Sequence, residues 1–349
     1  MEDTTINTEE AVTDCLSANR VDPVRERPAP ATRDIAARDL IREVVARTRR
    51  NFVRELWDWM RAGHVKATSL DELRQAIAAL TPPLDRSQEN DSESPIFLLA
   101  TGWRSGSTLL QRILVTDPTV LLWGEPLGEM ALLSGIAEML GGLSTYPNLA
   151  QCSAVDTPSP ASLPTTWIAT LFPPGSSLRS GLRKLFDGWL GDPARKGGWV
   201  RWGFKEVRLG AQEAILLHWL YPKAKFVLLS RNPYDCYRSL SDSGWHHIYH
   251  SRPNIRVDSA AGIARHWNRI ATSWSQLPDG FPVFRLRYED LIAGRIDFRE
   301  LESWLGVKLH EDLALSVRVG STARRHRLGL CERWIISHEA SAGMRVLGY

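Results

Sequence analysis

The sequence has few cysteines, and their spacing argues against two kinds of site. Only four occur among the 349 residues. They are scattered along the chain as Cys15, Cys152, Cys236 and Cys331, and no two of them form a CxxC pair. The sequence therefore predicts neither a zinc site nor a disulfide framework. A reducing, cytoplasmic setting is the expected one.

Long apolar runs and an excess of charge are also missing. No stretch approaches the roughly 20 apolar residues that a membrane-spanning helix needs. The acidic start MEDTTINTEE lacks the basic and apolar parts of a secretory signal. The chain has 43 Lys and Arg against 40 Asp and Glu, for a formal net charge of +3. General binding to nucleic acid or to a membrane is not expected, so any anion site must be local.

The chain divides into three predicted parts. Polar residues 1–31 predict a flexible tail, and residues 32–94 predict an N-terminal helical extension with a linker. In the extension, one long amphipathic helix should end near Gly63, and a second should begin with a capping box of Ser69 and Glu72. Residues 95–349 then form the main domain.

The main domain has the pattern of an α/β fold. The apolar runs IFLLA, VLLW, WVRWGF, KFVLLS and PVFRLR alternate with helical stretches, one of them from about Glu125. Such runs predict a mainly parallel sheet with helices on both faces, of the P-loop type. Ligands should gather at the carboxyl ends of its strands. The interval 141–198 is rich in Pro, Ser and Gly and predicts surface loops with a substrate-shaping insertion.

The stretch TGWRSGSTLLQRIL follows the first predicted strand and has the features of a phosphate loop. Gly102 and Gly106 allow tight turns, and Ser107 and Thr108 begin a helix whose free N–H groups and dipole attract anions. The lysine of a Walker loop is absent, and the cation in the loop is Arg104. A simple helix cap at a strand-to-helix turn is the alternative interpretation.

A second stretch, FVLLSRNPYDCYRSL, repeats this arrangement after another strand. Asn232 can cap a helix that has Pro233 at its first position, which leaves Arg231 at the end of the strand. Ser239 lies about two turns further along. Together the arginine and the hydroxyl could bind a second phosphate, although a structural ion pair at Arg231 is equally compatible with the pattern.

In this order, the two stretches resemble the 5′-phosphosulfate loop and the 3′-phosphate motif of sulfotransferases that use 3′-phosphoadenosine 5′-phosphosulfate (PAPS). The RSGST form is closer to carbohydrate, tyrosylprotein and bacterial small-molecule sulfotransferases than to cytosolic aryl enzymes. Further matches are WGEP, GFKE, RYEDL and the final LGY. The resemblance spans about residues 95 to 349.

The resemblance implies that PAPS is the co-substrate, that no metal takes part, and that the sulfonate passes to a hydroxyl, or less readily an amine, of a small molecule. Backbone N–H groups of the loop would hold the 5′-phosphate, with Arg104 near the sulfonate. The implied nucleotide-binding residues are Arg104, Ser105, Gly106, Ser107, Thr108, Arg231 and Ser239.

The resemblance also implies catalytic roles for Glu125, Lys205 and Arg104. Glu125 of WGEP occupies the place of the glutamate base of tyrosylprotein sulfotransferases, and Lys205 of GFKE would stabilise charge on the transferring sulfonate. From the residues alone, Glu125 could instead cap a helix or pair with an arginine. Lys205 could pair with an acid such as Glu206.

Other groups remain open as candidates. Glu129 or one of three histidines, His246, His247 and His250, could serve as the base in place of Glu125. A late basic cluster, Arg324, Arg325 and Arg327, could close over the nucleotide or form a solvated face.

Two other functions are compatible with the loop: a P-loop nucleotide kinase or NTPase, and an inactive nucleotide-binding protein of the same fold. The sequence does not identify the acceptor. A metabolite or natural product is expected, with no nucleic acid or membrane partner. The N-terminal helices could cover the acceptor site or form a homodimer.

Overall fold

A computed structural model describes residues 69–81, 94–126, 131–143, 161, 163–165, 173, 175–243, 259–310, 312 and 326–349. The predicted tail and the long N-terminal helix lie outside these residues. In the described part of the chain, one sheet has five strands in the order β2-β3-β1-β4-β5, and every neighbouring pair is parallel. The strands are β1 (Ile96–Ala100), β2 (Val120–Trp123), β3 (Arg201–Glu206), β4 (Lys225–Ser230) and β5 (Val283–Arg287). The predicted α/β class with a parallel sheet is confirmed.

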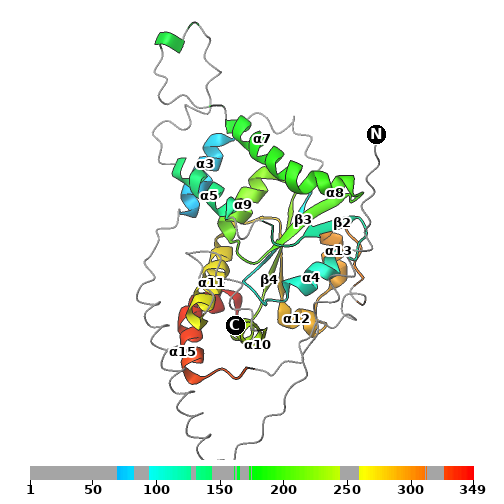
Figure 1. Ribbon diagram of the computed structural model, residues 1–349, viewed down its shortest axis with the longest axis vertical. Helices are drawn as coiled ribbons and strands as arrows, with labels where there is room; N and C mark the ends of the chain where they lie inside the picture. The colour runs from blue at the N-terminus through cyan, green and yellow to red at the C-terminus, as the bar shows by residue number, and fades with distance from the viewer. Residues whose placement is uncertain are drawn as a thin grey trace, which may run out of the picture. The chain divides into compact units, whose positions relative to one another are not determined.

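Helices cover both faces of this sheet (Figure 1). One face packs against α4 (Ser107–Leu114), α10 (Pro233–Ser243), α13 (Phe298–Leu305) and α15 (Leu330–Glu339). The other packs against α3 (Leu70–Leu80), α5 (Leu132–Leu143), α7 (Gly175–Phe186), α8 (Asp192–Lys196) and α9 (Ala211–Leu220). The remaining elements are η1 (Leu163–Thr165), η2 (Asp187–Gly191), α11 (Ala260–Ser273), η4 (Trp274–Gln276), α12 (Tyr288–Ile292) and α16 (Ser341–Leu347). None of the helices described is both long and apolar enough to cross a bilayer.

The sequence of the central strand β1 is continuously apolar because both faces of the strand are buried. Ile96 and Leu98 belong to the core on the α4 side, whereas Phe97 and Leu99 belong to the core on the α9 side. All four side chains are fully buried. Because side chains alternate between the faces of a strand, a strand that is covered on both sides has no polar position.

The capping box predicted in the N-terminal extension is present. Ser69 Oγ accepts from the backbone N–H of Glu72 at 3.2 Å, and Glu72 Oε2 accepts from the N–H of Ser69 at 2.8 Å. This pair begins α3, which contributes Leu73, Ala76 and Leu80 to the core beside α5 and α9.

The interval 141–198, for which the sequence predicts surface loops and an insertion with little periodicity, is helical at residues 175–196. There α7, the π-helical turn η2 and α8 follow one another without a break. The apolar residues that make this possible occur at every fourth position, which is a helical spacing that the many small and polar neighbours obscure. They are Leu178, Leu182, Phe186, Leu190 and Ala194.

The carboxyl ends of β1, β3 and β4 lie side by side and form a topological switch point, where ligands bind in open α/β sheets. From β1 the chain runs to β2 and β3 on one side and then to β4 and β5 on the other. Helix α11 packs across these ends: the His266 Nε2 lies 2.9 Å from the Val207 carbonyl oxygen, and the Trp267 Nε1–H donates to the Arg231 carbonyl at 2.9 Å. The helix therefore fixes the segments that leave β3 and β4.

Gly106 should be intolerant of any side chain. It has a φ of 88°, and a Cβ built there would lie 2.1 Å from Tyr288 Cδ2. Gly294 provides a matched control, because its φ is 65° but nothing lies within 4 Å of the added Cβ. We expect Gly294→Ala to lower the free energy of unfolding by about 1–2 kcal/mol through backbone strain alone. Gly106→Ala should lower it further in urea denaturation, and equal losses would show that Tyr288 moves away without cost.

Candidate functional site

The loop between β1 and α4 leaves a row of backbone donors open. Its first intrahelical hydrogen bonds run from the N–H groups of Leu109 and Leu110 to the Gly106 carbonyl, at 3.0 and 3.2 Å. The N–H groups from Ser105 to Thr108 therefore have no acceptor within the described residues. Arg104, with a φ of 62°, and Gly106 take left-handed backbone conformations that shape this turn. The N-terminus of α4 is thus built to receive an anion.

Buried hydroxyl groups at the same loop also lack partners. Ser105 Oγ and Thr101 Oγ1 are inaccessible to solvent and have no hydrogen-bond partner among the described residues. Both residues are 0% exposed. A buried hydroxyl that stays unsatisfied costs free energy, so each is suited to a ligand oxygen. These atoms, together with the open N–H groups, fit a phosphate.

The structure brings the two predicted phosphate motifs together. The Nε–H of Arg104, in the loop after β1, donates to Ser239 Oγ of α10 at 3.1 Å. Arg231, at the end of β4, donates from Nη1 to the carbonyl oxygen of Arg104 at 2.6 Å. The groups named for the two phosphates therefore form one continuous site across neighbouring strands.

The guanidinium of Arg231 packs against an aromatic ring instead of pairing with a carboxylate of the described residues. Its guanidinium lies 4.2 Å from the ring centroid of Tyr288, the tyrosine of RYEDL. The structural ion pair considered from the sequence does not occur within the described residues. The predicted cap of α10 is present, since Asn232 Oδ1 accepts from the Tyr234 N–H at 3.0 Å and Pro233 is the first helical residue.

The last residue of the chain braces the start of α10. The Tyr349 hydroxyl lies 3.0 Å from Ser230 Oγ and donates to Glu289 Oε2 at 3.0 Å, and Glu289 Oε1 accepts from the Asn232 N–H at 2.8 Å. Burial raises the pKa of the Tyr349 hydroxyl, which therefore stays protonated. This chain of contacts connects Tyr349 of LGY to the start of α10.

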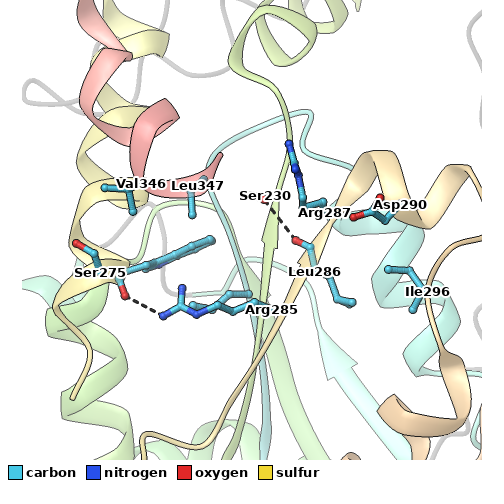
Figure 2. Close-up of a pocket in the computed structure, with 11 residues that line it drawn as sticks. Ser230, Ser275, Arg285, Leu286, Arg287, Asp290, Ile296, Val346 and Leu347 are labelled. Carbon is cyan, nitrogen blue, oxygen red and sulfur yellow. Dashed lines mark hydrogen bonds between the residues drawn. The ribbon is translucent and has the colours of Figure 1, made fainter. Parts of the chain in front are cut away.

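A cavity of about 450 Å³ borders these contacts at strand β5 (Figure 2). Figure 2 shows Arg285 and Asp290 on opposite sides of the β5 ribbon, with Ser230 on the neighbouring strand. None of the nucleotide-binding or catalytic residues predicted from the sequence lines this cavity. It is therefore distinct from the loop site.

The predicted catalytic residues Glu125 and Lys205 are in direct contact. Glu125 Oε1 pairs with Lys205 Nζ, and Glu125 Oε2 lies 2.8 Å from Arg208 Nη1. The sequence predicts a helix from about Glu125, but the next helix of the described residues is α5, which starts at Leu132, and Glu125 precedes it. It lies in the turn after β2, and its side chain is 25% exposed against 8% for Lys205. The carboxylate thus remains accessible while two cations hold it.

Arg208 is a functional candidate that the sequence analysis missed. It lies just beyond β3, bonds Glu125, and has its guanidinium 5.1 Å from the ring centroid of Trp103 in the phosphate loop. Trp103 in turn lies 4.6 Å from the ring of His266 on α11. The signal in the sequence is its place in KEVR, three residues after Lys205, at the end of the same strand.

Glu206 is buried beside this cluster. It is 0% exposed, and its Oε2 lies 3.3 Å from the same Arg208 Nη1 that bonds Glu125. Burial raises the pKa of Glu206 to about 7, with a further rise from the charge of Glu125 and an opposing effect of Arg208. The acid pair suggested for Lys205 does exist, but the acid that contacts Lys205 is Glu125 instead of Glu206.

Several candidates lie outside the described residues, namely Glu129, His246, His247, His250, Arg324 and Arg325. Arg327 is described and is exposed. Among the residues that the structure describes, no cluster of His, Cys, Asp and Glu could hold a metal ion.

The parallel sheet, the strand-to-helix loop with open N–H groups and the arginines at its edge are the features of an anion site in an α/β fold. A family model described as the sulfotransferase family matches residues 95–311. The chain therefore belongs to the sulfotransferase family. No curated protein sequence matches it.

Solved sulfotransferase structures are distantly similar to this chain. A sulfotransferase from Alicyclobacillus acidocaldarius shares 17% identity, with 72% of this chain and 94% of that chain covered and a TM-score of 0.39. The sulfotransferase domain of the Synechococcus PCC 7002 olefin synthase shares 21% identity over 65% of this chain and 78% of that one, with a TM-score of 0.37. The sulfotransferase domain from the curacin biosynthetic pathway shares 15% identity over 74% and 98%, with a TM-score of 0.42.

The raised pKa of Glu206 predicts a pH-dependent stability. Because the folded state holds this proton from pH 4.5, the ordinary value, up to about 7, stability should fall as pH rises through that window. At about 1.4 kcal/mol per pKa unit the loss amounts to roughly 3 kcal/mol. Glu206→Gln cannot titrate and should lack this decline. Urea denaturation of both proteins across the window measures the difference, and parallel curves would contradict the shift.

Proposed function

We propose that the protein transfers the sulfonate of PAPS to a hydroxyl group of a small-molecule acceptor. The observation that carries this proposal is the meeting of the two motifs, in which Arg104 bonds Ser239 and Arg231 bonds the Arg104 backbone. A nucleotide with both a 5′-phosphosulfate and a 3′-phosphate has one anionic group for each motif. The family match supports the transfer reaction.

The loop residues would bind the 5′ end of the donor. The open N–H groups from Ser105 to Thr108 and the buried Ser105 hydroxyl provide donors for phosphate oxygens. Arg104 provides the positive charge that a Walker lysine would otherwise supply. On this view Arg231 and Ser239 bind the 3′-phosphate.

Glu125 would accept the proton of the acceptor hydroxyl. The acceptor oxygen forms a bond to sulfur, the bond from sulfur to the bridging oxygen breaks, and the electron pair leaves with 3′-phosphoadenosine 5′-phosphate. Lys205, which contacts Glu125, would balance the charge that moves to the leaving oxygen. Arg208 keeps the second oxygen of Glu125 oriented.

The acceptor is proposed to be a metabolite or natural product with a hydroxyl group, and an amine is the second choice. The scattered cysteines favour the cytoplasm as the place of reaction.

Incubation with PAPS and a panel of hydroxylated small molecules should release 3′-phosphoadenosine 5′-phosphate. Glu125→Gln should lower kcat by about 100-fold or more, because a positioned general base contributes about 10²–10⁴-fold. Its affinity for 3′-phosphoadenosine 5′-phosphate should stay within about threefold of the wild-type value. Glu300→Gln, an exposed change on α13, is the matched control and should behave as the wild type. Full turnover of Glu125→Gln would exclude it as the base.

The assignment of the 3′-phosphate can be tested without turnover. The wild type should bind 3′-phosphoadenosine 5′-phosphate at least about tenfold more tightly than adenosine 5′-phosphate, since Arg231 and Ser239 contribute charge-assisted hydrogen bonds. Arg231→Met and Ser239→Ala should reduce that preference, as measured by calorimetry. The loss should be larger for 3′-phosphoadenosine 5′-phosphate than for adenosine 5′-phosphate, because the bonds of both side chains to Arg104 also support the loop. An equal loss of affinity for both nucleotides would show that these residues do not bind the 3′-phosphate.

A further inference from the structure

Two carboxylates share one guanidinium nitrogen at the proposed catalytic site. Arg208 Nη1 lies 2.8 Å from Glu125 Oε2 and 3.3 Å from Glu206 Oε2. Nη1 carries two N–H bonds and donates to both oxygens, but the guanidinium lies closer to Glu125. The nearer partner is Glu125, so Glu206 holds the weaker contact.

Glu125 and Glu206 contact Arg208 from different segments of the structure, the turn after β2 and the end of β3. In the register of the sheet, Lys205 is paired with Leu98 and Glu206 with Leu99. Successive residues of a strand point to opposite faces, so Glu206 projects from the face opposite to Lys205. It is 0% exposed, whereas the Glu125 side chain is 25% exposed. Glu206 is thus buried away from the solvent, and it is connected to Glu125 through Arg208, which contacts both carboxylates.

We propose that Glu206 is a positioning residue that tunes Glu125 as a proton acceptor by competing with it for Arg208. This inference rests on the proposed function, in which Glu125 takes the proton of the acceptor hydroxyl.

The protonation state of Glu206 decides how Arg208 is shared. When Glu206 is protonated, it has no charge to attract the guanidinium, and Arg208 stays on Glu125 and stabilises its ionised form. When Glu206 loses its proton to the solvent, its carboxylate attracts the Arg208 guanidinium and adds a second negative charge near Glu125. Both effects make Glu125 a stronger proton acceptor. The pKa of about 7 for Glu206 places this change in the neutral range.

Other ionisable groups of the described residues near this cluster have partners of their own. From α11, Arg269 donates to the Arg208 carbonyl at 2.8 Å, and burial lowers the pKa of His266 to about 3, which leaves it neutral. At the start of α9, Glu213 accepts from Ser134 Oγ at 2.7 Å and from the Gly210 N–H at 2.8 Å. Lys205 stays on the other oxygen of Glu125. Within the part of the chain that the structure describes, Glu125 and Glu206 are the carboxylates that pair with Arg208.

The first test is the pH profile of kcat. The wild type should gain activity with an inflection near neutral pH. Glu206→Gln, whose amide oxygen can still accept from Arg208 but cannot ionise, should lose the inflection. Its kcat should stay within about twofold of the wild type at about pH 6 and fall about tenfold below it at about pH 8, with KM for PAPS unchanged. Glu206→Asp should keep an inflection, because it still titrates.

Three results would overturn the proposal: an inflection that persists in Glu206→Gln, a wild-type profile without an inflection, or an equal loss for Glu206→Gln at both pH values. The last would mark a purely structural role. If Glu206→Gln does not fold, the wild-type and Glu206→Asp profiles decide. Absence of turnover in the wild type on all acceptors would instead count against the proposed function.

A second test needs no activity. Infrared spectroscopy can follow the protonated carboxyl band of Glu206, assigned by its loss in Glu206→Gln. In Glu125→Gln the neighbouring negative charge is gone and Arg208 becomes available to Glu206, so the midpoint of this band should fall to lower pH. Glu300→Gln should leave the midpoint unchanged. An unchanged midpoint in Glu125→Gln would show that the two acids do not compete and would overturn the proposal.

Discussion

The structure of the candidate site depends on the hydrogen bonds that join the loop after β1 to the end of β4. Arg231 binds the carbonyl oxygen of Arg104, and the Arg104 side chain binds Ser239 on α10. The loop has left-handed backbone at Arg104 and Gly106, a conformation that an L-residue such as Arg104 adopts only when its surroundings hold it there. The contact therefore both stabilises the loop and aligns the two phosphate motifs, which are far apart in the sequence.

A second set of contacts couples this loop to the acid–base cluster. The Trp103 ring contacts both Arg208 and His266. Arg208 bonds Glu125 and Glu206, and His266, on α11, contacts the Val207 carbonyl oxygen. A shift of the loop on binding an anion would move Trp103 and hence Arg208. The elements proposed to bind the donor and to orient the base therefore form one packed unit, as a reaction that needs in-line alignment requires.

Much of this arrangement could be predicted from the sequence. The apolar strands, the glycines of the loop and the Asn232-Pro233 helix start are local signals, and each reflects a property of a few neighbouring residues. The helices at residues 175–196 were not predicted, because small and polar residues hide the apolar residues that recur there at every fourth position. Arg208 was missed for another reason. Its partners lie in the turn after β2, on β3 and in the phosphate loop, and no local sequence pattern shows that these segments meet.

The sharing of Arg208 also bears on how a carboxylate in contact with two cations would act as the proposed base. In that reaction Glu125 would give up its negative charge while Lys205 and Arg208 are next to it. Each cation would then need another anion: for Lys205 the leaving oxygen of the donor, and for Arg208 the carboxylate of Glu206. A second carboxylate, buried at the end of β3, would keep Arg208 paired during this step.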